Sequence, residues 1–154
     1  MKVCTLLLIV RGDKILLAMK KRGFGAGRWN GIGGKVEQDE TIEQALVRES
    51  IEEIGVKPLQ YTKVAVHDFA FPEGTTDMQV HTFVTTNWEG EPVETEEMAP
   101  RWFKHTDIPY DDMWQDDVVW LPLVLRGRKL HTRFMFDADE AMTAAQIDIV
   151  DEVT

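Results

Sequence analysis

Residues Gly34–Val56 read GKVEQDETIEQALVRESIEEIGV, and this stretch carries the strongest pattern in the chain. Thr41 is a suitable residue to begin a helix, apolar residues then recur at helical spacing, and Gly55 is a typical stop. We therefore predict a helix over Thr41–Ile54.

Three glutamates close the predicted helix. Glu49, Glu52 and Glu53 are spaced at i, i+3 and i+4, so they share one face. In an acidic protein the ordinary interpretation is a solvated helix face. Like charges at this spacing cost a helix roughly 0.2–0.5 kcal/mol per pair, however, so a nearby cation explains them better. The pattern indicates Mg²⁺, and with it a substrate that carries phosphates.

Size and charge restrict the class of protein. The 154 residues suit a single domain spanning 1–154, and 44% hydrophobic residues can fill a core. A net charge of −10 gives no basic footprint for a nucleic-acid polymer or an anionic membrane. The charge argues against a nucleic-acid polymer or a membrane as partner. We expect a small-molecule substrate and a monomer.

The N-terminal stretch Val3–Val10 is apolar but too short to span a bilayer. A signal peptide is the competing interpretation, but Arg11 to Lys14 follow where a small-residue cleavage site should lie. The single cysteine, Cys4, allows no internal disulfide and is expected to be a packed small residue. We expect a first strand here and a cytoplasmic protein.

The remaining pattern predicts mostly strands. Val3–Val10 and Lys14–Lys21 flank a Gly-Asp turn and form a hairpin, followed by a glycine-rich loop. Further strands are expected at Leu59–Phe71, Met78–Thr86, Ala99–His105 and Lys129–Phe136. Tyr110–Leu125 fits a loop or a short helix, and Ala144–Val153 fits a helix or a strand. The expected class is α/β or α+β, with a mixed β-sheet sandwiched between helices.

The spacing of glycine, arginine and glutamate residues in the opening stretch resembles the Nudix box. The matching residues are Gly34, Glu40, Arg48, Glu49, Glu52, Glu53, Gly55 and Val56. Ser50 is the exception, because the family carries an aliphatic residue there. We expect its hydroxyl to bond back to the carbonyl of Leu46 at a small cost in stability. The resemblance implies the Nudix fold and hydrolysis of a nucleoside diphosphate-linked substrate.

Two further segments resemble one branch of that family, the MutT-homologue type hydrolases of oxidised purine nucleoside triphosphates. They are KKRGFGAGRWNGIGGKV at Lys20–Val36 and DDMWQDDVVWLPL at Asp111–Leu123. The resemblance runs nearly end to end and weakens after about Asp137. It implies an 8-oxo-dGTPase that also accepts 2-oxo-dATP, releases monophosphate and pyrophosphate, and protects DNA by sanitising the nucleotide pool.

Metal and catalytic roles follow from the glutamates and the resemblance. Oxygen ligands suit a hard cation, so we expect Mg²⁺, or Mn²⁺ in its place, on Gly34, Glu49, Glu52 and Glu53, with Glu97 added by resemblance. Glu53 is the favoured general base, and Glu49 is the alternative. Arg48 is expected to pair with Glu40 and orient the helix.

Base recognition is assigned to Asn30 and the pair Asp116-Asp117. Two adjacent carboxylates in an apolar pocket should not both ionise, so one can donate and the other accept. Exchanging these roles would admit both oxidised purines. The remaining expected substrate-binding residues are Thr5, Lys20, Phe24, Gly33, Gly34, Lys35, Phe69, Phe71, Met78, Trp114 and Trp120.

Plainer interpretations exist for these residues. Adjacent aspartates near a turn usually cap it, and aromatic residues and methionine are more often core than pocket. The four histidines, His67, His81, His105 and His131, show no metal spacing and are expected to be structural.

Two alternative functions remain open at this point. A Nudix hydrolase of other nucleotides or nucleotide sugars would keep the acidic helix and change the pocket, so Asn30, Asp116 and Asp117 discriminate it. A non-catalytic nucleotide-binding module is a different class, and the intact glutamates argue against it.

Overall fold

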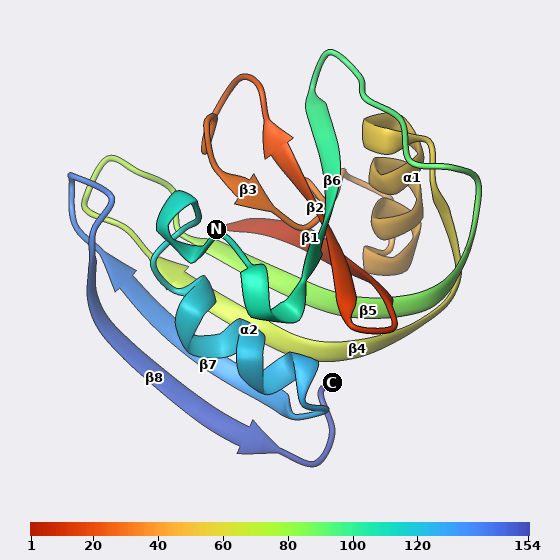
Figure 1. Ribbon diagram of the computed structural model, residues 1–154. Helices are drawn as coiled ribbons and strands as arrows, with labels where there is room; N and C mark the ends of the chain where they lie inside the picture. Colours follow the sequence, from red (N-terminus) through yellow and green to blue (C-terminus); the bar gives the residue numbers. More distant parts are fainter.

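A mixed, strongly curved sheet of eight strands forms the centre of the computed structural model, which describes residues 1–154 (Figure 1). The strands are β1 (Lys2–Arg11), β2 (Lys14–Lys20), β3 (Trp29–Asn30), β4 (Lys57–Ala70), β5 (Met78–Glu89), β6 (Met98–Lys104), β7 (Lys129–Phe136) and β8 (Met142–Val150). Their order is β3-β2-β1-β5-β4-β7-β8, with β6 also paired to β2. The β1–β5 and β4–β7 pairs are parallel, and the other pairs are antiparallel.

The N-terminal hairpin is the one predicted from the Gly-Asp turn. Gly12 has a φ of 59°, which the turn requires and which glycine adopts without a Cβ penalty. Residues 4–9 of β1 are buried, because this strand lies between β2 and β5 and is covered on both faces. Strand β1 is therefore a rigid central strand against which the following loops pack.

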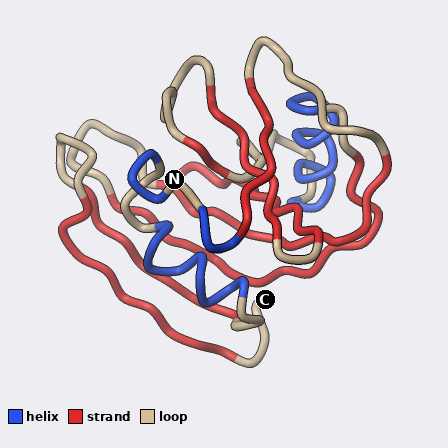
Figure 2. The backbone as a smooth tube through the Cα atoms, in the orientation of Figure 1, coloured by secondary structure: helices blue, strands red, loops and turns tan.

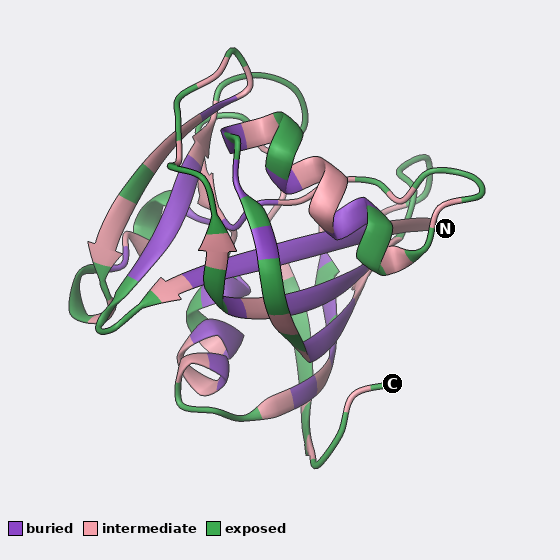
Figure 3. Ribbon diagram, turned by 90° about the vertical axis from the view of Figure 1, so that its right-hand side faces the viewer, coloured by how far each residue is buried: buried purple, intermediate pink, exposed green.

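Helix α1 (Ile42–Ile54) confirms the helix predicted from the acidic stretch. Thr41 and Gln44 form a capping box, and Gly55 ends the helix in the left-handed conformation. The helix packs on β1, β4 and β6 through Ala45, Leu46 and Ile54, and Figure 3 shows its exposed residues on the outward side.

The expectation for Ser50 is wrong. Its side chain is fully buried within this apolar face, and its hydroxyl oxygen has no hydrogen-bond partner, at Leu46 or elsewhere. A buried unpaired hydroxyl costs about 1–3 kcal/mol. The cost falls on helix packing, since the hydroxyl lies within the apolar face of α1.

The second helix, α2 (Asp117–Leu125), covers the other side of the sheet over β7 and follows two short 3₁₀ turns at His105–Asp107 and Tyr110–Asp112 (Figure 2). It resolves the ambiguity over Tyr110–Leu125 in favour of a turn followed by a helix. Strand β8 resolves the other open segment, and it forms the mostly exposed edge of the sheet. Neither helix has the length and apolar character needed to cross a bilayer.

Candidate active site

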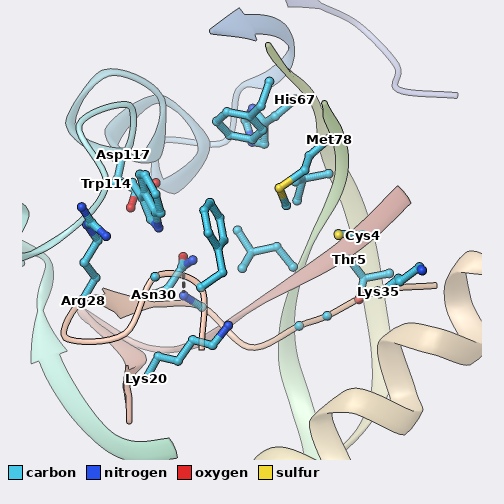
Figure 4. A pocket seen from close by; sticks show the side chains of 18 of the residues that line it. Cys4, Thr5, Lys20, Arg28, Asn30, Lys35, His67, Met78, Trp114 and Asp117 are labelled. Carbon is cyan, nitrogen blue, oxygen red and sulfur yellow. Dashed lines mark hydrogen bonds between the residues drawn. The ribbon is translucent and has the colours of Figure 1, made fainter. Parts of the chain in front are cut away.

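A cavity of about 300 Å³ opens where the glycine-rich loop, the start of α2 and the ends of β1, β4 and β5 converge (Figure 4). Every residue predicted to bind substrate lines it: Thr5, Lys20, Phe24, Asn30, Gly33, Gly34, Lys35, Phe69, Phe71, Met78, Trp114, Asp116, Asp117 and Trp120. Glu53 and Glu97 also line it, whereas Arg48, Glu49 and Glu52 do not. One cavity therefore joins the apolar pocket to the acidic end of α1.

Aromatic rings form the apolar end of the cavity. The rings of Phe24 and Trp114 lie 5.2 Å apart between centroids, and Phe24 meets Phe71 edge-on at 6.1 Å. In Figure 4, Trp114 and Met78 lie on different sides of the cavity, with another lining side chain drawn between them. A flat heterocycle fits between such surfaces, because it buries both faces while its polar edge stays free.

Arg28 is a pocket residue that the sequence did not indicate. Its guanidinium lies 4.0 Å from the ring centroid of Trp114, and its Nη2 lies 3.4 Å from a carboxylate oxygen of Glu140. Arg28 thus links the glycine-rich loop to the β7–β8 turn and fixes the plane of the indole.

The two aspartates at the start of α2 are almost completely buried, with exposed fractions of 2% for Asp116 and 4% for Asp117. Asp116 does not cap the helix; its Oδ2 instead accepts a hydrogen bond from the Trp120 indole at 2.8 Å. Asp116 Oδ1 and Asp117 Oδ2 have no partner in the protein. Buried polar atoms are normally paired, so these two are available to a ligand.

The protonation of this pair is shifted in the direction the sequence predicted. Burial raises the pKa of Asp116 to about 6, although the hydrogen bond from Trp120 opposes the change. Burial first, and the charge of Asp116 second, raise the pKa of Asp117 well above its ordinary value. At least one carboxyl group is therefore protonated in mildly acidic solution and can donate a hydrogen bond.

The pair makes stability depend on pH. The unfolded chain releases these protons above about pH 4, whereas the folded protein keeps them to about pH 6 or higher, so stability falls as pH rises through this window.

Asp117→Asn removes one of the two charges. The difference in free energy of unfolding between the variant and wild type is expected to shift in favour of the variant by about 1–2 kcal/mol from pH 5 to pH 8. Urea titrations across this range measure it, with the exposed Asp112→Asn as a control that should show no such trend. A pH-independent difference would contradict buried, protonated aspartates.

Asn30 presents its amide to the cavity from β3. Its Oδ1 accepts a hydrogen bond from the Gly31 N–H at 2.9 Å, which orients the side chain (Figure 4). The NH₂ group remains as a donor, since the carbonyl is already occupied. The cavity thus combines an amide donor with two buried carboxyl groups.

Arg48 organises the acidic end of α1. Its guanidinium donates to both oxygens of Glu40, at 2.7 and 2.9 Å, and to the carbonyl of Lys35 at 3.1 Å. The Arg48 hydrogen bonds lower the pKa of Glu40 to about 2. The expected pairing of Arg48 with Glu40 is present, and it ties α1 to the loop that contains Gly34.

Glu53 reaches the cavity from the last turn of α1. Its Oε2 accepts a hydrogen bond from the Gly33 N–H at 3.3 Å. Burial, followed by the negative charge of Glu49, raises the pKa of Glu53 to about 8. Two close carboxylates with little solvent around them are the environment in which a cation stabilises both.

The residues expected to hold metal are suitable in type but are not gathered into one cluster. No group of three or more His, Cys, Asp or Glu side chains lies close enough to hold an ion. Arg48 Nη1 donates to Glu49 at 2.9 Å and to Glu52 at 3.2 Å, and Arg22 pairs with Glu97. The mutual repulsion of Glu49 and Glu53 and their oxygen donors fit a hard divalent cation. The ligand set stays a prediction.

His67 also lines the cavity, although its sequence context had suggested a structural role. It precedes Phe69 on β4 and Phe71 just past the end of that strand at alternate positions, so the parity that placed the two phenylalanines on one face already included it.

The chain matches the NUDIX domain model over residues 2–124. It is 44% identical to the oxidized purine nucleoside triphosphate hydrolase of Danio rerio, covering 99% of this chain and 97% of that protein. The enzyme of the same name from Mus musculus is 42% identical, with 97% and 96% covered. Among solved structures, the MutT protein from Bacillus halodurans superposes with a TM-score of 0.85 at 27% identity, covering 96% and 98%. The chain belongs to the Nudix family, and the predicted family and fold are confirmed.

Proposed function

We propose that this protein hydrolyses oxidised purine nucleoside triphosphates, 8-oxo-dGTP and 2-oxo-dATP, to the monophosphate and pyrophosphate. The observation that carries the proposal is the single cavity that joins the buried, unpaired Asp116-Asp117 pair to Glu53. The relatives from Danio rerio and Mus musculus are named for the same activity. The protein would remove damaged nucleotides before a polymerase incorporates them into DNA.

The base is read at the apolar end of the cavity. Trp114 and Met78 sandwich the purine, Asn30 donates to an acceptor on its edge, and Asp116 and Asp117 supply one acceptor and one donor. Because the two carboxyl groups can exchange these roles, two differently oxidised purines are accepted. An unoxidised purine leaves a buried carboxyl group unpaired and binds less tightly.

The triphosphate extends toward α1. Lys20 and Lys35 line this part of the cavity and attract its negative charge, and Thr5 and Gly33 border it. We propose Gly34, Glu49, Glu52, Glu53 and Glu97 as the metal ligands and Mg²⁺ as the ion, with Mn²⁺ as a substitute. The ion would neutralise phosphate charge and make water a better nucleophile. Glu53 then accepts the proton from the attacking water as the α–β phosphoanhydride bond breaks.

We also propose that residues 1–154 act as one catalytic domain, as a monomer in the cytoplasm. Pyrophosphate release measured across oxidised and normal triphosphates, with and without Mg²⁺, tests the activity. Metal-dependent release that favours the oxidised purines is expected. Equal rates on normal nucleotides, or release only from nucleotide sugars, would indicate a different Nudix substrate, and nucleotide binding without turnover would indicate a non-catalytic module.

The role of Asp116 has its own test. Asp116→Asn keeps the shape of the side chain but fixes it with one donor and one acceptor, so it cannot exchange protonation with Asp117. We expect the ratio of kcat/KM for 8-oxo-dGTP over 2-oxo-dATP to change about tenfold or more, while the Mg²⁺ dependence stays the same. A uniform loss on every substrate would instead mark Asp116 as a structural residue that supports Trp120.

A further inference from the structure

His67 is a buried polar side chain for which neither the fold nor the proposed reaction supplies a role. It lies on β4 with 1% of its surface exposed, and its ring packs against Trp120 with centroids 4.3 Å apart and planes tilted by 44°. It lines the same cavity as the aspartate pair (Figure 4). Its Nε2 atom has no hydrogen-bond partner in the protein.

The position of the proton on the imidazole follows from the hydrogen bonds around it. His67 Nδ1 lies 2.6 Å from the hydroxyl oxygen of Thr132 on β7, and Thr132 is itself 5% exposed. If Nδ1 carried the proton, the Thr132 hydroxyl hydrogen would be buried without an acceptor, because the structure contains no other bond from this hydroxyl. With the hydroxyl donating to Nδ1, the hydroxyl hydrogen and Nδ1 are both paired, and only Nε2 of the ring lacks a partner. The proton of the ring therefore lies on Nε2.

The imidazole is neutral as well as oriented. Burial lowers the pKa of His67 to about 3, so the ring does not become a cation at physiological pH. A neutral ring with Nδ1 occupied is a donor through Nε2 and nothing else.

The His67 Nε2–H donor lies in the part of the cavity that contains Trp120 and the aspartate pair. Trp120, against which His67 packs, donates its indole N–H to Asp116 Oδ2 at 2.8 Å. Four buried atoms of cavity-lining residues lack partners: Asp116 Oδ1, Asp117 Oδ2, His67 Nε2 and Thr5 Oγ1. The first two can accept or, when protonated, donate, whereas the third only donates.

We propose that His67 is a specificity-determining residue whose Nε2–H donates a hydrogen bond to an acceptor on the bound heterocycle, a carbonyl oxygen or an unprotonated ring nitrogen. The proposal rests on the proposed nucleotide hydrolase function and adds a determinant to its pocket. A fixed donor of this kind selects against any base that presents an N–H or amino group at the same place, because two donors would face each other.

Kinetics of His67→Phe test the proposal, because phenylalanine keeps a ring against Trp120 and removes the donor. We expect KM for 8-oxo-dGTP to rise about five- to tenfold and kcat to change less than twofold, as the loss of one neutral hydrogen bond would cause. His67→Gln, which restores an N–H donor, should recover part of the loss. His131→Phe, on the outer face of β7, is the matched control and should behave as wild type. A parallel fall in kcat and thermal stability, with no recovery in His67→Gln, would overturn the proposal in favour of a packing role.

Imidazole ¹⁵N NMR supplies a readout that does not depend on turnover. Without metal, His67 should show protonated Nε2 and unprotonated Nδ1, and the Nε2 resonance should shift when 8-oxo-dGMP is added. Thr132→Val, which removes the hydroxyl, should yield a mixture of tautomers and an intermediate KM. An Nδ1–H tautomer, or an Nε2 signal unchanged by bound 8-oxo-dGMP, would refute the inference. If wild-type protein neither binds 8-oxo-dGMP nor hydrolyses 8-oxo-dGTP, the proposed function has failed instead.

Discussion

Glu53→Gln is expected to lower kcat by about 10²- to 10⁴-fold, the range in which general bases contribute. Glutamine keeps the length of the side chain and can still face the Gly33 N–H, but it cannot accept a proton from water. The base pocket lies at the other end of the cavity, so binding of 8-oxo-dGMP without metal should remain within about twofold of wild type. Steady-state kinetics and titration calorimetry measure the two quantities.

Stability distinguishes this loss from misfolding. Burial and the charge of Glu49 raise the pKa of Glu53, so the ionised carboxylate destabilises the metal-free folded protein. Glu53→Gln removes that charge and should raise Tm above pH 8, by roughly 2–4 °C for each kcal/mol regained. Glu43→Gln, exposed in the first turn of α1, is the control and should change neither property. Turnover that survives in Glu53→Gln would rule out Glu53 as the base.

The sequence predicted the parts of the fold whose causes are local. Helix α1 begins at a capping box and ends at a left-handed glycine, and the β1–β2 hairpin turns at Gly12, so both carry their boundaries in adjacent residues. Strand β8 does not. Its alanines fit a helix equally well, and its strand conformation comes from pairing with β7, which the local sequence does not encode.

The site residues were likewise predicted only in part, where the pattern is visible along the chain. The glutamates and the aspartate pair were found because their spacing is visible along the chain. The link from Arg48 to Glu49 and Glu52 was not foreseen, because it depends on side-chain geometry. The role of Arg28 arises from its contact with Trp114 and Glu140, which are distant in sequence. The unpaired Ser50 hydroxyl was missed because local propensity offered it a bond that packing does not permit.

Gly33→Ala should have the largest effect on folding. A Cβ at Gly33 would lie 1.8 Å from the carbonyl oxygen and 2.6 Å from the carbonyl carbon of Thr5. These are backbone atoms of β1, which is held between β2 and β5 and cannot retreat. The loop would have to move instead, breaking bonds such as Thr5 N–H to Gly34 O at 2.9 Å and Leu7 N–H to Ile32 O at 2.6 Å. We expect a loss of roughly 3–5 kcal/mol in the free energy of unfolding, measured by urea titration.

Gly34→Ala provides the contrast that separates folding from function. A Cβ at Gly34 would meet the side-chain carboxylate of Glu49, 2.5 Å from its Cδ, and the three nearest atoms all belong to that carboxylate. That carboxylate can swing away, so the variant should lose less stability than Gly33→Ala, about 1–2 kcal/mol. Moving Glu49 from the loop disturbs the proposed metal ligands, however, so activity should fall at least tenfold and need more Mg²⁺ for half-maximal rate. If instead Gly33→Ala folds with wild-type stability, or Gly34→Ala keeps wild-type Mg²⁺ dependence, then the close approach of this loop to β1 and Glu49 is not what positions the site.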